Sequence, residues 1–190
     1  MQRLTLHPDG PLLGPDGQPF QGHQVDARLI DVAHLAAHVV SYALPQGDVV
    51  KVLVQYSCHC WTSAHDPVQH AGQVQIMDGT RARVQDPVRL QASVALSQLI
   101  ASLDRHRIYV TASDRNYGVY NAAFVAEDGT AYTAFFVLRP QKGRFDGIRH
   151  SLGLFVESAY HAQQPQVGSK TSLTAVLAAA LKGDKVKYRR

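Results

Sequence analysis

Four strand-like segments follow one another in the second half of the chain, at residues 107–113, 119–126, 131–138 and 151–160. Short turn sequences join the first three, and a longer loop, residues 140–149, is expected to lead to the fourth. Strands that are consecutive in sequence and closely connected usually pair with each other. The sequence therefore predicts an antiparallel meander sheet.

Helical patterns flank this run of strands. Asp86 and Pro87 supply an N-cap and a first-turn proline for a helix over residues 88–103, whose apolar stripe would lie across the sheet. An Ala- and Leu-rich helix is expected over residues 172–181, ended by Gly183. The predicted class is α+β, an antiparallel meander sheet packed by one or two helices.

The first half of the chain predicts an N-terminal helix-strand-hairpin segment. Apolar residues recur at helical spacing over residues 31–40, and the β-branched residues 49–56 are typical of a strand. Asp78-Gly79 separates residues 73–77 from residues 80–84, and this dipeptide supplies the positive φ angles of a two-residue hairpin turn.

The chain has the length of one domain, with 190 residues, of which 45% are hydrophobic and 18% charged. We expect an irregular lead-in over residues 1–24, a single α+β domain over 25–162, and a linker, short helix and basic tail over 163–190. Neither a membrane-spanning segment nor a signal peptide is recognisable, which predicts a soluble cytoplasmic protein. The net charge of +4 allows a nucleic-acid partner without requiring one.

The segment that follows the predicted strand 49–56 holds both cysteines. Two cysteines and two histidines have the spacing C-x-C-x4-H-x4-H and the ligand types of a zinc site: Cys58, Cys60, His65 and His70. If the strand continues, both thiols share the apolar face of Val52 and Val54, where cysteine behaves as a small hydrophobic residue. Buried thiols are the favoured interpretation, and zinc is the alternative.

The opposite face of the same strand is polar and is a candidate binding surface. Aromatic and arginine side chains are enriched at protein interfaces. The candidate binding residues are Ser57, His59, Trp61, Tyr117 and Arg144.

A second group of polar residues surrounds the last predicted strand. Its members are Arg139, Arg149, His150, Ser158, Tyr160 and His161. Metal-independent cleavage of a phosphodiester needs a general acid or base together with fixed cations, and these residue types supply both.

The order of elements over residues 86–162, one helix and then four strands ending in L-F-V-E-S-A-Y, resembles the barnase, EndoU, colicin and RelE-like nuclease fold. The blocks V-D-A-R-L-I-D-V-A-H-L, Q-Y-S-C-H-C-W and L-F-V-E-S-A-Y also resemble an uncharacterised family from phages, plasmids and bacterial genomes. The nuclease resemblance implies cleavage or binding of RNA, whereas the second resemblance implies no established activity.

Two functions are therefore expected. The first is a non-catalytic binding or inhibitor protein of a mobile genetic element, whose partner is a host protein or ribonucleoprotein complex. The alternative is a metal-independent ribonuclease-like or RNA-binding protein. Neither function requires a cofactor, and zinc enters only if the Cys/His group binds it.

Overall fold

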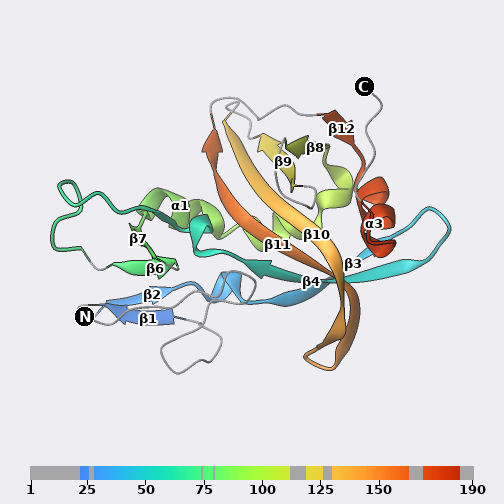
Figure 1. Ribbon diagram of the computed structural model, residues 1–190, viewed down its shortest axis with the longest axis horizontal. Coiled ribbons are helices and arrows are strands. Elements are labelled where there is room, and N and C mark those ends of the chain that lie inside the picture. Colours follow the sequence, from blue (N-terminus) through green and yellow to red (C-terminus); the bar gives the residue numbers. More distant parts are fainter. Residues whose placement is uncertain are drawn as a thin grey trace.

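The structure, a computed structural model, describes residues 22–25, 28–73, 75–78, 80–111, 119–125, 130–162 and 169–184. Within these ranges a seven-stranded sheet forms the centre of the molecule, in the order β12-β8-β9-β10-β11-β4-β3 (Figure 1). Its strands are β3 (His38–Ala43), β4 (Val49–Tyr56), β8 (Ile108–Thr111), β9 (Val119–Val125), β10 (Ala131–Phe145), β11 (Ile148–Ala162) and β12 (Ser169–Thr171).

Two smaller sheets and several helices complete the described part of the fold. The small sheets are β1 (Gly22–Val25) with β2 (Arg28–Asp31), and β5 (Thr62–Ala64), β7 (Arg81–Gln85) and β6 (Ile76–Asp78). The α-helices are α1 (Pro87–Ser93), α2 (Leu96–Ala101) and α3 (Leu173–Leu181), and the 3-10 turns are η1 (Ala33–Leu35), η2 (Cys58–Cys60) and η3 (Leu103–Arg105). None of the helices described could cross a bilayer, because each is too short or too polar.

The α+β class is confirmed, but the sheet is not the all-antiparallel meander that the sequence predicted. Strands β8 to β11 are consecutive antiparallel neighbours, whereas β4 lies parallel to β11, with Val54 opposite Leu154. Val52 to Tyr56 are buried without interruption. A strand covered on both faces has this continuous burial, which is typical of parallel pairing inside a sheet.

The predicted N-terminal helix is wrong. Residues 31–40 contain the end of β2, the turn η1 and the start of β3. Val39 and Val40 pair with Leu53 and Val52 of β4. Because β-branched residues fit a pleated surface, pairing with β4 outweighs the helical spacing of the apolar residues.

The predicted helix over residues 88–103 forms as α1, α2 and η3. Its start is confirmed, because the Asp86 carboxylate accepts hydrogen bonds from the backbone N–H groups of Val88 and Arg89, each at 3.1 Å. The break follows Ser93, whose hydroxyl donates to the Leu90 carbonyl at 2.7 Å and so competes with the helical backbone bonds.

Helices α2 and α3 pack with residues of the main sheet in one hydrophobic core. Leu96 and Ile100 of α2 and Leu177 of α3 are fully buried there. The C-terminal helix is confirmed, with the Ser172 hydroxyl accepting from the Ala175 N–H and Gly183 at a φ of 73°. Strand β12, which precedes it, pairs with β8 at the edge of the sheet.

Strands β10 and β11 extend beyond their neighbours as a two-stranded hairpin, residues 140–150, which we name the arm. It projects from the body of the molecule at the lower edge of Figure 1. The sequence predicted a loop here. Asp146 and Gly147 both have positive φ, 48° and 74°, which is the backbone of a type I′ turn and matches the right-handed twist of the two strands.

Candidate functional site

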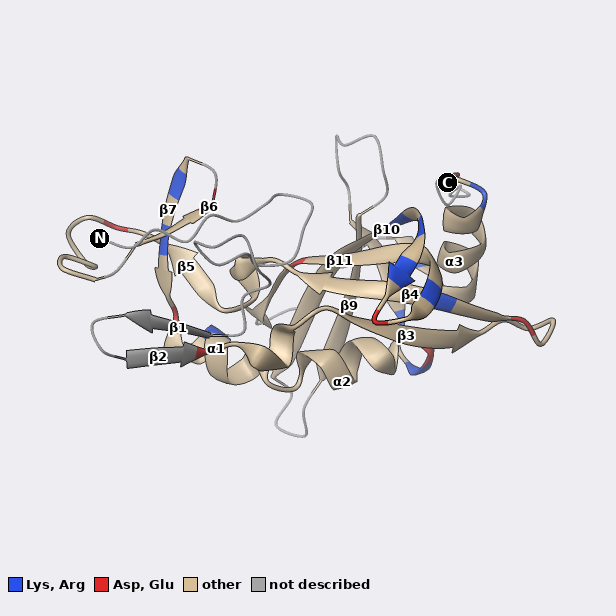
Figure 2. Cartoon of the chain, turned by 90° about the horizontal axis from the view of Figure 1, so that it is seen from below, with Lys and Arg blue, Asp and Glu red and all other residues tan. Residues whose placement is uncertain are grey.

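The arm is strongly cationic. Lys142, Arg144 and Arg149 are exposed along it, and Asp146 in the turn is its single acidic residue. Figure 2 shows basic positions near this end of β10. Arg144 and Arg149 are paired directly across the hairpin. Like charges in this position repel each other, since the Cβ atoms of opposed residues are only about 5 Å apart.

A pocket of about 280 Å³ lies at the base of the arm. It is lined by Gln55, Arg139, Pro140, Gln141, Gly153 and Phe155. The Gln141 side chain lies against the Cα of Gly153, where any Cβ would overlap its amide oxygen. Glycine at this position therefore lets the Gln141 side chain form one wall of the pocket. We name the arm and this pocket together the arm-and-pocket surface.

His150 holds the junction between arm and sheet. The residue is 7% exposed, and its ring Nδ1–H donates to the Gln141 carbonyl at 2.9 Å. The register of β10 and β11 shifts between Pro140 and Gly143, and the His150 ring packs against Gly143. A β-bulge of this kind bends a strand. His150 therefore stabilises the bulge at the base of the arm.

The six residues expected to cleave RNA are not brought together. Arg149 and His150 lie in the arm, while His161 is opposite Tyr132 at the other end of β11. Eleven steps along a strand span about 36 Å, at about 3.3 Å per residue. Ser158 and Tyr160 lie near the His161 end, where the Tyr160 ring stacks on Phe135 with centroids 5.4 Å apart.

The two thiols point into the core, as predicted, but the backbone that carries them was predicted wrongly. Residues 58–60 form the turn η2, and Cys58 and Cys60 are 1% and 0% exposed. Burial raises the pKa of the Cys58 thiol to about 12 and also raises the pKa of the Cys60 thiol. Both are therefore protonated at neutral pH, which is unlike a nucleophilic cysteine.

His59, in the same turn, faces a different strand. Its Nε2 lies 2.6 Å from Oδ2 of Asp78 in β6. Desolvation lowers the pKa of His59, and the hydrogen bond to Asp78 opposes that effect. Arg89 of α1 donates to the His59 carbonyl at 3.1 Å and to the Thr62 carbonyl at 3.2 Å. Helix α1 thereby holds the turn in place.

The predicted four-ligand zinc group does not assemble. His65 and His70 are near each other, with ring centroids 5.9 Å apart, and His70 Nδ1 accepts from the Asp66 N–H. Of the residues that the structure describes, those whose metal-binding atoms gather are Cys58, His59 and Asp78. The spacing C-x-C-x4-H-x4-H therefore does not correspond to a common site, because residues 58–60 form the turn η2 and the chain does not continue as a strand.

The predicted binding residues are in different environments. Arg144 is exposed on the arm. Trp61 is fully buried and offers no surface to a partner, because it packs in the core beside the two thiols. The Ser57 hydroxyl accepts from the His59 N–H as the cap of η2, at 3.1 Å. Tyr117 lies outside the described residues.

The sequence alone did not predict two features of the candidate sites, the turn at the tip of the arm and the contact between His59 and Asp78. Asp146-Gly147 is the same dipeptide as Asp78-Gly79, which indicated the β6–β7 hairpin although Asp78 itself pairs with Arg81, and it marks the tip of the arm. No comparable signal links His59 to Asp78, because the two are joined only by the packing of η2 against β6.

Comparison with known proteins gives one family. The model of the YjaZ family matches residues 22–181. No curated protein and no solved structure matches the chain. The description of this family names no activity. This agrees with the resemblance to an uncharacterised family that the sequence blocks indicated.

Proposed function

The chain belongs to the YjaZ family, and we propose that it is a non-catalytic binding protein that docks on a macromolecular complex through its arm-and-pocket surface. In this proposal the protein serves a mobile genetic element, and the partner is a host protein or ribonucleoprotein complex with an acidic surface. Binding inhibits or redirects that complex without any chemical step.

The opposed pair Arg144 and Arg149 carries the proposal. Two like charges directly across a hairpin destabilise it, so the arm holds a pair of residues that is unfavourable for its own folding. A carboxylate or phosphate of the partner that lies between the two guanidinium groups would accept charge-assisted hydrogen bonds from both of them. These bonds would offset the repulsion between the two arginines. The pair therefore favours the bound state of the arm over the free state.

The shape of the surface also supports docking. The arm projects from the sheet and ends in a tight turn (Figure 1), and Lys142, Arg144 and Arg149 are exposed on it. The pocket beside it can receive one side chain of the partner, with Gln55 and Gln141 as hydrogen-bonding groups. Cations around a pocket speed association with an acidic partner and set its orientation.

The separation of the acid-base candidates supports binding over cleavage. His150 is committed to the Gln141 carbonyl, and His161 is about 36 Å along the strand from it. One phosphodiester cannot contact both residues. An RNA component of the partner remains compatible with the cationic arm.

Affinity capture with a charge-reversed arm tests the proposal. Tagged wild-type protein, an Arg144→Glu/Arg149→Glu variant and an Arg105→Glu/Lys170→Glu control are each exposed to a bacterial lysate. The control reverses two exposed charges outside the arm. We expect a stoichiometric partner that is retained by wild type and control, lost from the arm variant, and weakened by salt.

Two results would overturn the proposal. One is an identical set of captured components from all three proteins. The other is cleavage of bulk RNA by purified wild type that survives in the arm variant and disappears in a His150→Ala/His161→Ala variant, which would favour a ribonuclease instead.

A further inference from the structure

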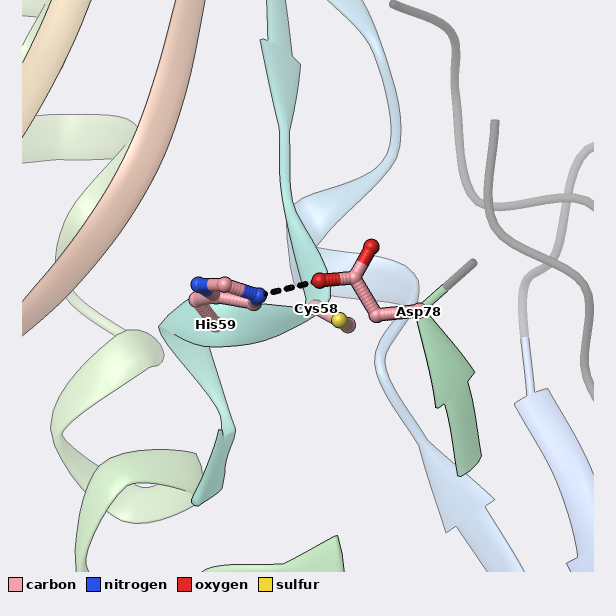
Figure 3. A group of neighbouring side chains, drawn as sticks. All are labelled: Cys58, His59 and Asp78. Carbon is pink, nitrogen blue, oxygen red and sulfur yellow. Dashed lines mark hydrogen bonds and ion pairs between the residues drawn. The ribbon is translucent and has the colours of Figure 1, made fainter. Parts of the chain in front are cut away.

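Three side chains with metal-binding atoms meet where the turn η2 faces strand β6. Cys58 and His59 come from η2, and Asp78 comes from the end of β6 (Figure 3). One sulfur, one ring nitrogen and one carboxylate oxygen all lie within 4.8 Å of one another. We propose that Cys58, His59 and Asp78 form a zinc site with an open fourth position.

The geometry fits zinc with small adjustments. Zinc bonds of about 2.3 Å to sulfur and about 2.0 to 2.2 Å to nitrogen and oxygen place tetrahedral ligand atoms about 3.3 to 3.6 Å apart. The His59 and Asp78 atoms are 2.6 Å apart, bridged by one proton. Zinc replaces that proton and moves the two atoms apart by less than about 1 Å. Sulfur, nitrogen and oxygen are all ligand types that zinc accepts.

The backbone that carries the three ligands is held before any metal arrives. The Thr62 hydroxyl donates to the Cys58 carbonyl at 2.7 Å, and Arg89 donates to the His59 carbonyl at 3.1 Å. Asp78 is fixed by its pairing with Arg81 in the β6–β7 hairpin. A metal site needs ligands whose positions are set by such surrounding bonds.

Access and charge are also suitable. The Cys58 sulfur forms the buried floor, while the His59 and Asp78 side chains are 28% and 27% exposed, so an ion can enter from their side. Zinc with one thiolate and one carboxylate has no net charge. The guanidinium of Arg83 interacts with Cys58 electrostatically, and a site without net charge does not repel it.

Zinc titration of the whole protein tests the site. Chelator-treated protein is titrated with Zn²⁺ by calorimetry, and with Co²⁺ by absorption spectroscopy. We expect about one zinc per chain, a thiolate-to-cobalt charge-transfer band, and a higher melting temperature with zinc.

The two cysteines provide a matched comparison. Both are buried free cysteines in one turn, so Cys58→Ala and Cys60→Ala each remove one sulfur atom from the core. We expect Cys58→Ala to bind zinc more than about tenfold less tightly and to lose the charge-transfer band, while Cys60→Ala keeps both. A His65→Gln/His70→Gln variant is also expected to bind zinc as wild type does.

Asp78→Asn covers the case in which Cys58→Ala fails to fold, since Asp78 lies on the half-exposed side and asparagine can still bond His59. Weaker zinc binding with an unchanged circular dichroism spectrum supports the proposal. The proposal is overturned if wild type binds no zinc at micromolar concentrations. It is also overturned if Asp78→Asn binds zinc as wild type does, or if Cys60→Ala or the His65/His70 variant loses zinc binding as Cys58→Ala does.

Discussion

Arg144 and Arg149 are directly opposed across the arm, two residues from the Asp146-Gly147 turn on one side and two on the other. The hairpin keeps this pair although the Asp-Gly turn and the neighbouring Phe145–Ile148 pair are sufficient to define its register. Cross-strand repulsion of this kind lowers the free energy of unfolding, and the two guanidinium groups can bind one anionic group between them.

Reversing one of these charges should stabilise the protein. Arg149→Glu places a carboxylate opposite Arg144, and we expect the free energy of unfolding to rise by about 0.2 to 1 kcal/mol in low salt. Urea denaturation measures the change, and added salt should reduce it. The same substitution should weaken partner capture. A loss of stability on Arg149→Glu would contradict the repulsion.

The turn of the arm depends on glycine. Gly147 has a φ of 74°, and an alanine there pays a steric cost of about 1 to 2 kcal/mol. We expect Gly147→Ala to lower the free energy of unfolding by about that amount, measured by urea denaturation. Asp146→Asn is the control, because asparagine adopts positive φ readily. Equal stability of Gly147→Ala and wild type would rule out this turn geometry.

Arg89 joins α1 to the turn η2 and to strand β11. It donates to two carbonyls, those of His59 and Thr62, and its guanidinium lies 5.2 Å from the centre of the Tyr160 ring. We expect Arg89→Met to cost about 1.5 to 3 kcal/mol of stability, the range for hydrogen bonds to charged groups. The exposed Arg81→Met should change stability by less than about 0.5 kcal/mol. Similar effects of the two substitutions would refute the role of Arg89.

Acidification should destabilise the protein below pH 6.5. Desolvation lowers the pKa values of His34 and His106 from the ordinary value of 6.5. As the pH falls, these histidines are protonated in the unfolded chain before they are protonated in the folded protein. The free energy of unfolding is therefore at its highest above pH 6.5, and it decreases as the pH falls from 6.5 toward the folded-state pKa values. Urea denaturation at several pH values measures the slope. A His34→Gln/His106→Gln variant should show a shallower fall, and an unchanged slope would exclude these two histidines as its source.

Trp61 reports on the core, because it is the only tryptophan and is fully buried. We expect blue-shifted fluorescence from the folded protein and a red shift at the same urea concentration at which circular dichroism is lost. Trp61→Ala should cost about 3 to 5 kcal/mol, while Trp61→Phe should cost less. Emission typical of exposed tryptophan in the folded protein would contradict the burial.

Sequence reasoning was most accurate where structure depends on a few neighbouring residues. The cap at Asp86 and the end of the C-terminal helix at Gly183 depend on local hydrogen bonds and local φ angles, and each occurs where it was predicted. The β6–β7 hairpin also forms, although Asp78 pairs with Arg81 and the turn therefore begins one residue later than predicted. The error over residues 31–40 has a different origin. The spacing of the apolar residues suits a helix, but the partner that makes residues 38–43 a strand, β4, begins nine residues after Val40 and is not part of that local pattern.

The candidate sites were less predictable than the fold. The sequence predicts Arg144 as a binding residue but does not predict its pairing with Arg149, because it predicts a loop for the segment between them. His59 was selected as well, whereas its partner Asp78 was noticed only as part of a turn. Both relationships join different strands or turns, so spacing along the chain could not show them.

The amino-acid sequence alone determined the α+β class, the inward position of both thiols, the β6–β7 hairpin, the helix start at Asp86 and the C-terminal helix, because each follows from local sterics, local hydrogen bonds or the burial of apolar side chains. Tertiary structure decided that β4 pairs in parallel with β11, that two arginines oppose each other on the arm, and that a sulfur, an imidazole and a carboxylate meet beside η2. These features depend on which distant segments pack together. The free energy of that packing is a sum over interactions throughout the chain, so no local pattern predicts it.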